Sequence, residues 1–118
     1  MHIITLTLSA LVVLEHLYIM FLETIATSSK KTARTFNMAH DQLQRQVVRT
    51  LFKNQGVYNL LLAVLILIAI LQEDLFWLRL LLGFVILVAA FGSLTSSKTI
   101  IIKQGGLAIL ALACSYLL

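Results

Sequence analysis

The sequence predicts an all-α integral membrane protein: a four-transmembrane-helix up-down bundle with a basic interfacial helix between spans one and two. Hydrophobic residues make up 60% of the 118-residue chain and charged residues only 12%, whereas a soluble domain is about 45–50% apolar and about 25% charged. The apolar residues also fall into four long runs separated by short polar stretches, which is typical of membrane-crossing helices. The length favours a single four-span domain over 1–118.

Span one is expected at about 3–25, long enough to cross a hydrocarbon core of about 30 Å. The polar stretch 27–52 follows it. Its apolar residues are spaced by seven, four and four, which places them near one side of a helix: Phe36, Leu43, Val47 and Leu51. Its last basic residues repeat every four positions: Arg45, Arg49 and Lys53. We therefore predict a short interfacial helix that leads into span two and whose basic side meets phospholipid headgroups.

Spans two, three and four are expected at about 51–71, 75–94 and 100–118. Residues 72–74 form a tight polar connector between spans two and three, and 95–98 form the next loop. Trp77 lies where an interface anchor is common. Arg79 lies about one turn inside span three, and we expect its side chain to extend back toward Glu73, Asp74 or the headgroups.

The basic residues predict the orientation. Eight of the nine Lys and Arg residues lie in or beside the first and third connectors, and only Arg79 lies on the other side. Short loops rich in Lys and Arg stay in the cytoplasm, so both termini are expected outside a multi-pass protein of the cell membrane. The net charge of +4 is then a match for membrane lipids as partners, and we expect no nucleic acid partner.

Span one carries an unusual polar set inside its apolar run: Glu15, His16 and Glu23. Charged groups at the centre of a bilayer cost roughly 2.5–3.5 kcal/mol each, so these side chains are expected to have polar neighbours. Spans two and four supply candidates at matching depth, in the cytoplasmic half: Asn54, Gln55, Tyr58, Asn59 and Gln104.

Helical spacing strengthens this grouping. His16 and Glu23 are seven residues apart and share a face of span one. In span two, Gln55, Tyr58 and Asn59 follow an i, i+3, i+4 pattern and form one stripe. Such a set can be a hydrogen-bonded network that fixes the register of the helices. Two carboxyls and a histidine exceed what register requires, so we favour a functional polar pocket.

The following residues and motifs form a pattern across essentially the whole chain: Glu15-His16, Glu23, Phe36, Asn54-Gln55-Gly56, Tyr58-Asn59, Gly92 and Gln104-Gly105. This pattern resembles that of small bacterial four-helix membrane proteins catalogued as domain of unknown function thirteen-oh-four. The resemblance implies four spans, a bacterial inner-membrane location and these residues acting as one set. It implies no particular activity.

The pocket suggests binding or transport of a small amphiphilic or cationic ligand. Glu15 or Glu23 would attract the cation, the amides and Tyr58 would orient it, and His16 would exchange a proton near neutral pH. One alternative is a membrane enzyme of the acid–base isomerase type, acting on a lipid-soluble substrate with His16 and Glu15 as acid and base.

A second alternative is an accessory or structural subunit, and a homodimer also stays open. No cofactor is expected, because the chain has no phosphate-loop, dinucleotide or haem-attachment motif. A metal site built from Glu15, His16 and Glu23 would have one intramembrane histidine and no suitable cysteine, which is a poor ligand set for zinc. We expect no metal.

Overall fold

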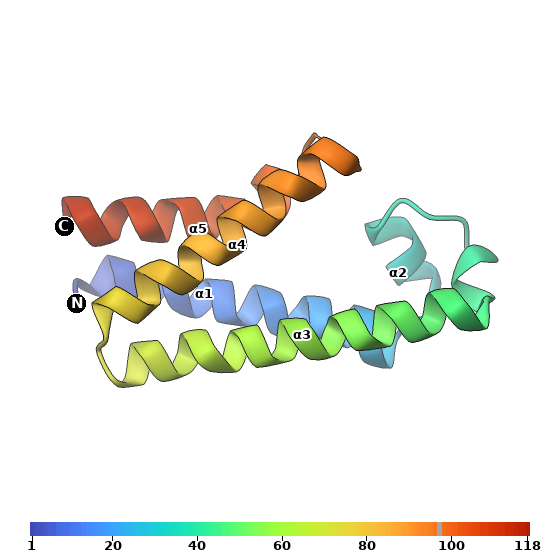
Figure 1. Cartoon of the computed structure of the whole chain (residues 1–118), viewed down its shortest axis with the longest axis horizontal. Coiled ribbons are helices and arrows are strands. Elements are labelled where there is room, and N and C mark those ends of the chain that lie inside the picture. Colours follow the sequence, from blue (N-terminus) through green and yellow to red (C-terminus); the bar gives the residue numbers. More distant parts are fainter. Residues whose placement is uncertain (97) are drawn as a thin grey trace. The chain divides into compact units, whose positions relative to one another are not determined.

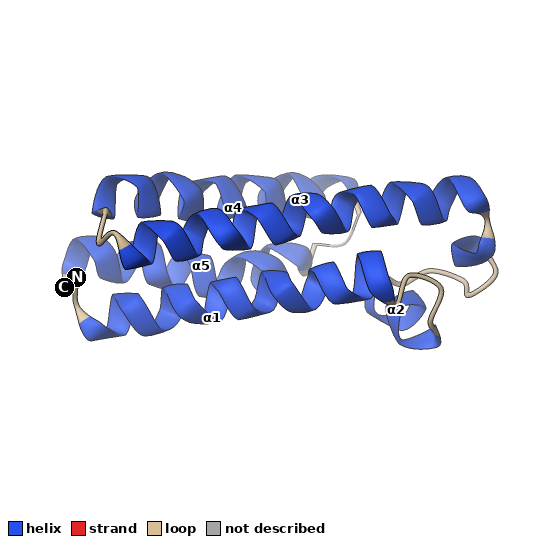
Figure 2. Ribbon diagram, turned by 90° about the horizontal axis from the view of Figure 1, so that it is seen from below, coloured by secondary structure: helices blue, strands red, loops and turns tan. Residues whose placement is uncertain are grey.

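The computed structural model describes residues 1–96 and 98–118, and the regular structure in this part of the chain is helical (Figure 2). Ser97, in the loop predicted at 95–98, lies outside the described residues. Along the chain (Figure 1), the elements are α1 (Ile3–Met20), η1 (Phe21–Ile25), α2 (Lys30–Thr35), η2 (Gln42–Gln44), α3 (Gln46–Leu71), α4 (Leu75–Thr95) and α5 (Ile100–Leu117).

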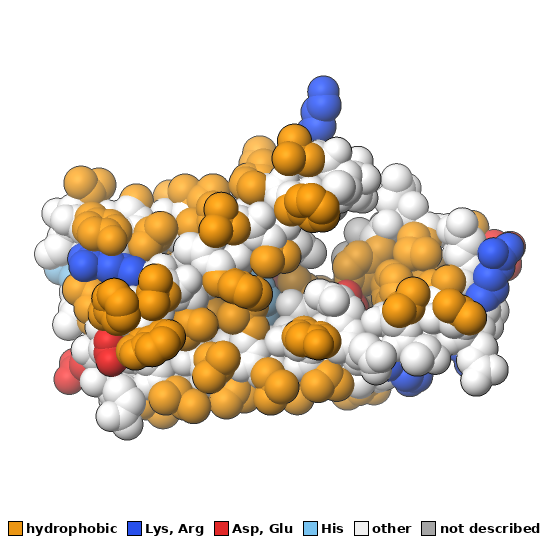
Figure 3. All heavy atoms as spheres, viewed as in Figure 1, with side chains coloured by type: hydrophobic (Ala, Val, Ile, Leu, Met, Phe, Trp, Pro, Cys, Tyr) orange, Lys and Arg blue, Asp and Glu red, His pale blue; other side chains and the backbone are white. Residues whose placement is uncertain are grey.

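Three of the helical segments are long and apolar enough to cross a membrane: Ile3–Ile25, Gln46–Leu71 and Leu75–Thr95. A shorter apolar helix, α5, follows them. Hydrophobic side chains cover much of the surface of α3 and α4 (Figure 3), as lipid-facing helices require. The all-α class and the multi-pass membrane character are thereby confirmed.

The chain forms two compact units, and the boundaries between them fall inside α1 and α3. The first, which we call the apolar unit, comprises Met1–Glu15 and Ala63–Leu118. The second, the basic unit, is His16–Leu62 and contains six of the nine Lys and Arg residues. The units are described separately below.

In the apolar unit, the connector between α3 and α4 is as tight as predicted. Glu73 adopts a left-handed conformation, with φ of 52°. Its N–H donates to the Ile70 carbonyl (3.0 Å), and the Asp74 N–H donates to the Ala69 carbonyl (3.0 Å), a common way to end a helix. The Asp74 carboxylate then accepts from the Trp77 N–H (3.1 Å) and caps α4. One short segment therefore ends one span and begins the next.

Helices α4 and α5 pack along each other. The buried residues of α4 are spaced by four, three and four, and lie on one side of the helix: Leu78, Leu82, Val85 and Ala89. Gly105 of α5 lies so close that an added Cβ would be 3.2 Å from the Cβ of Ala89. Ala108 and Ala111 are also fully buried. Small residues on α5 let the two backbones approach, as in many membrane helix pairs.

In the basic unit, the predicted single interfacial helix is wrong in detail. Ser29 caps α2 by accepting from the Thr32 N–H (3.1 Å), and Asn37, with φ of 54°, ends this helix after six residues. The short η2 follows, with Leu43 fully buried. Helix α3 then begins at Gln46, five residues before the predicted start of span two. The periodicity of the apolar residues concealed these breaks, because caps and left-handed residues interrupt a helix without changing its spacing.

Candidate functional site

Span one ends in a π-helical turn, η1, which contains Glu23. In this turn the Ala26 N–H donates to the Phe21 carbonyl (2.8 Å), five residues back instead of four. The wider turn leaves carbonyl groups that need donors, and Thr27 supplies one, its hydroxyl donating to the Glu23 carbonyl (2.7 Å). Turns of this kind are frequent at functional sites.

Thr32, fully buried in α2, stabilises the same helix end. Its hydroxyl lies 3.2 Å from the Leu22 carbonyl and 2.7 Å from the Ala26 carbonyl. Because these contacts join α2 to the end of span one, the turn that follows η1 is held by side chain–backbone hydrogen bonds. The position of Glu23 is thereby fixed from its C-terminal side.

Helix α3 is attached to η1 by a reciprocal pair of hydrogen bonds. The Thr24 hydroxyl donates to the Lys53 carbonyl (3.0 Å), and the Lys53 ammonium donates to the Thr24 carbonyl (3.0 Å). Gly56, one turn further along, is buried against Thr24: an added Cβ would lie 1.8 Å from the Thr24 hydroxyl oxygen and 3.0 Å from its backbone nitrogen. The contact requires glycine at position 56.

Asn59 makes the central contact of the site. Its amide Nδ2 donates to Oε1 of Glu23 over 2.6 Å and also lies 3.3 Å from the Gln55 carbonyl. Glu23 is only 6% exposed. The structure thus joins the predicted site residues Glu23 and Asn59 directly, through α1–η1 and α3.

A family model described as "Protein of unknown function (DUF1304)" matches residues 10–116. The chain belongs to this family. The resemblance noted from the sequence is confirmed, and all eight candidate site residues lie within the matched range. The chain is also similar to "Uncharacterized protein YpaA" of Lactococcus lactis subsp. lactis (strain IL1403), with 57% identity over 118 residues, 98% of this chain and 99% of the relative. No solved structure matches the chain.

The other predicted residues of span two are exposed. Tyr58 is 73% exposed, and Asn54 and Gln55 are exposed as well. Tyr58 and Asn59 are adjacent, so they project about 100° apart on α3. Within the predicted stripe, Asn59 is the residue whose side chain is hydrogen-bonded to Glu23.

The remaining candidates are divided between the units. His16 belongs to the basic unit and is buried, with 4% of its surface exposed. Glu15 and Gln104 belong to the apolar unit and are half-buried. Oε1 of Glu15 is buried without a hydrogen-bond partner among the described residues. Within residues 1–96 and 98–118, no group of three or more His, Cys, Asp or Glu is placed to hold a metal ion.

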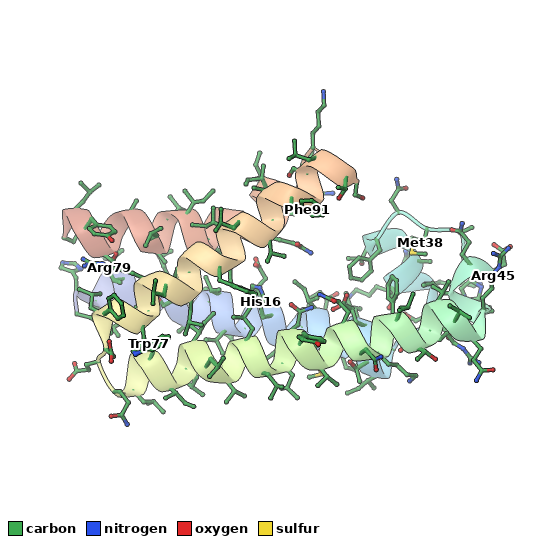
Figure 4. All side chains as sticks on the ribbon, in the orientation of Figure 1. His16, Met38, Arg45, Trp77, Arg79 and Phe91 are labelled. Carbon is green, nitrogen blue, oxygen red and sulfur yellow. The ribbon has the colours of Figure 1, made fainter. Side chains whose placement is uncertain are left out.

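Arg79 has partners that the sequence did not indicate. Instead of reaching Glu73 or Asp74, it extends from α4 to the last turn of α5 (Figure 4). Its Nε donates to the Ser115 hydroxyl (3.1 Å) and an Nη donates to the Ser115 carbonyl (2.5 Å). The guanidinium also lies 3.8 Å from the ring centroid of Tyr116. A cation at this position is favourable because carbonyls at a helix C-terminus carry partial negative charge.

Two further buried polar side chains lie in α1, and the sequence did not indicate them as candidates. The hydroxyl oxygens of Thr5 and Ser9 are buried in the apolar unit and have no hydrogen-bond partner among the described residues. Their four-residue spacing places them on one face of α1. The four-residue spacing is visible in the sequence. Because Thr and Ser are common in apolar helices, it does not by itself indicate a site.

Proposed function

We propose that this protein crosses the membrane four times and uses Glu23 to bind a small amphiphilic cation in the cytoplasmic half of the bilayer. Span one would comprise α1 with η1, and spans two to four would be α3, α4 and α5. At 1.5 Å per residue, the 18 residues of α5 extend about 27 Å, close to the thickness of a hydrocarbon core. The basic unit would face the cytoplasm, with both termini outside.

The observation that carries the ligand assignment is the environment of the Glu23 carboxyl. It is buried at the end of a span and accepts a hydrogen bond from a neutral amide, Asn59. Lys53 reaches the same helix turn, but its ammonium donates to the Thr24 carbonyl. Among the described residues, Glu23 makes no ion pair with Lys or Arg. A carboxylate placed in this way is expensive unless a cation joins it.

Asn59 would then orient the ligand's charged group by holding one carboxyl oxygen, which leaves the other for the ligand. Apolar parts of an amphiphilic ligand would contact the surrounding helices, as in most small-molecule sites. Participation of Glu15, His16, Asn54, Gln55, Tyr58 and Gln104 stays a prediction from the sequence. The acid–base enzyme also stays a prediction, and the exposure of Tyr58 gives it no support.

The test uses purified protein in a mild neutral detergent and tetraphenylphosphonium, a lipophilic cation, as the probe. We expect this cation to raise the thermal unfolding midpoint of the wild-type protein, while the anion tetraphenylborate, of similar size and shape, does not. Glu23→Gln should remove the shift because the side chain keeps its size and loses its charge. Glu73→Gln, an exposed acid of the 72–74 connector, is the matched control and should retain it.

An equal shift in wild type and Glu23→Gln would contradict the assignment, as would equal shifts with the cation and the anion. Mass spectrometry of molecules that co-purify with wild type and not with Glu23→Gln would then identify the natural ligand.

A further inference from the structure

The buried carboxyl of Glu23 is held at one oxygen by a neutral donor in a fixed orientation. Its Oε1 accepts from Nδ2 of Asn59 over 2.6 Å. The same Nδ2 lies 3.3 Å from the Gln55 carbonyl, one turn earlier in α3, so a second acceptor keeps the amide nitrogen on the side of Glu23. The printed contact of Asn59 is with Oε1 alone, and the second oxygen, Oε2, is where the carboxyl can change its state.

A neutral donor suits both protonation states of a carboxyl group. An amide N–H can donate to an oxygen of the carboxylate, and it can donate equally to the carbonyl oxygen of the acid. A Lys or Arg cation in the same place would favour the carboxylate alone. Burial disfavours a carboxylate that no cation accompanies. The empty site is therefore most stable when Oε2 carries a proton, and the occupied site when a cation replaces that proton.

The cations nearest to this carboxyl along the chain have other partners. The charged and titratable residues of α1, α2 and α3 in the basic unit, apart from the carboxyl itself, are the following: His16, Tyr18, Lys30, Lys31, Arg34, Arg49, Lys53 and Tyr58. The Lys53 ammonium donates to the Thr24 carbonyl (3.0 Å). The Lys31 ammonium lies over the Tyr18 ring, 5.3 Å from its centroid. The other two cations of α2 are exposed. None of these printed contacts neutralises the carboxyl.

His16 is the other buried titratable side chain of α1 in the basic unit (Figure 4). Proton exchange was expected at this residue from the sequence. It lies seven residues before Glu23, which is about 10 Å along the helix axis. The geometry favours Glu23 as the exchanging group, because Asn59 holds that carboxyl in a way that is compatible with both of its states. The two assignments can be separated by experiment.

We propose that Glu23, held by Asn59, exchanges a proton for the bound cation; this inference rests on the proposed function. In the empty site Oε2 carries the proton. When the cation binds, the O–H bond breaks, its electron pair stays on the carboxylate, and the proton leaves to water. One positive charge replaces another, so the net charge of the site is the same in both states. Asn59 donates to Oε1 throughout and acts as a positioning residue.

The experiment is isothermal titration of the full-length protein in neutral detergent with tetraphenylphosphonium, in buffers that differ in their heat of ionisation. The dependence of the binding heat on the buffer counts the protons released. We expect about one proton per bound cation at the acidic end of the pH range. The affinity should rise about tenfold per pH unit, because fewer protons compete for Oε2, and should level off once the empty site is ionised.

Two variants test the assignment to individual residues. His16→Gln should release the same number of protons per bound cation, and loss of this release would transfer the exchange to His16 and overturn the proposal. Asn59→Ala removes a donor to the carboxylate, so the pH at which the affinity levels off should rise. An unchanged pH profile in Asn59→Ala would overturn the positioning role of Asn59. Glu73→Gln, the exposed control, should match the wild-type protein.

The exchange and the proposed function fail in different ways. Binding by the wild-type protein without proton release, and with the same affinity at every pH, overturns the exchange and leaves the cation site intact. Binding that persists in Glu23→Gln contradicts the cation site itself, as does absence of binding to the wild-type protein. The proton count is measured on the wild-type protein, so this decision does not depend on the folding of a variant.

Discussion

The helices within each of the two units are joined by different interactions. In the apolar unit, α4 and α5 meet through leucine, valine and alanine side chains, with Arg79 and Ser115 as a polar contact near one end. In the basic unit, buried apolar residues such as Leu22 and Leu43 and the contact between the Phe36 and Phe52 rings are joined by hydrogen bonds from Thr, Lys and Asn side chains to backbone or carboxyl oxygens. The same short chain thus uses two ways of joining helices.

The difference follows from the state of the backbone at each contact. Within lipid, apolar side chains gain little by leaving hydrocarbon for one another, so close approach through small residues provides the attraction. Where a helix ends, its last carbonyls have no intrahelical donors. Thr27, Thr32 and Lys53 supply donors at the end of span one. Specific polar contacts are therefore concentrated where a span ends and irregular backbone begins.

The largest effect is expected at Gly56, where the basic unit is packed most tightly. In Gly56→Ala the new Cβ displaces Thr24, and the reciprocal bonds between Thr24 and Lys53 are lost. We expect a loss of about 2 kcal/mol in the free energy of unfolding, measured by denaturant titration in detergent. Gly83→Ala is the matched control in the apolar unit, because an added Cβ there meets nothing within 4 Å. Equal stability of the two variants would show that the Thr24 contact is not tight.

The hydrogen bond between Glu23 and Asn59 should have an intermediate effect. A double-mutant cycle of Glu23→Ala and Asn59→Ala is expected to give a coupling energy of about 1 kcal/mol, within the range for polar contacts between membrane helices. Gln55→Ala, an exposed side chain on the same helix, should show no coupling to Glu23. The unfolding free energies of the single and double variants provide the measurement. A coupling near zero would mean that the two side chains act independently.

The smallest of these effects is expected at the polar contact of the apolar unit. Arg79→Gln removes the donors to Ser115 and the cation above the Tyr116 ring. Because the unit also retains its apolar contacts, we expect a loss of only about 1 kcal/mol. Ser115→Ala should cost less, since its carbonyl still accepts from Arg79. A loss in Arg79→Gln larger than that of Gly56→Ala would reverse the comparison between the units.

The spans could be predicted because long apolar runs are a strong signal. Segment Ile3–Ile25 was predicted with the observed bounds, and the 72–74 connector was predicted from its polar residues. The start of α3 at Gln46 differs from the prediction because the polar residues before position 51 were assigned to a separate interfacial helix leading into span two. Helix length is set by capping and hydrogen bonding as well as by hydropathy.

The site was predicted less completely. Glu23 and Asn59 were placed in one set from depth and residue type, and they are hydrogen-bonded. The contact of Thr24 with Lys53 and Gly56 could not be predicted from the sequence. A contact between a side chain and the backbone of a distant segment produces no regular spacing of residue types. Tyr58 was assigned to the same side of α3 as Asn59. The two side chains nevertheless project about 100° apart, so one can contact Glu23 while the other stays exposed.

The π-helical turn η1 affects where span one can accept the insertion or deletion of a residue. A residue gained or lost in the middle of α1 would rotate everything beyond it by about 100° and turn its polar side chains to a new direction. A π turn already holds one residue more than an α turn. Loss of a residue within Phe21–Ile25 would convert it to ordinary helix while both flanking segments keep their facing. Span one therefore tolerates a one-residue length change close to Glu23, where a regular helix would not.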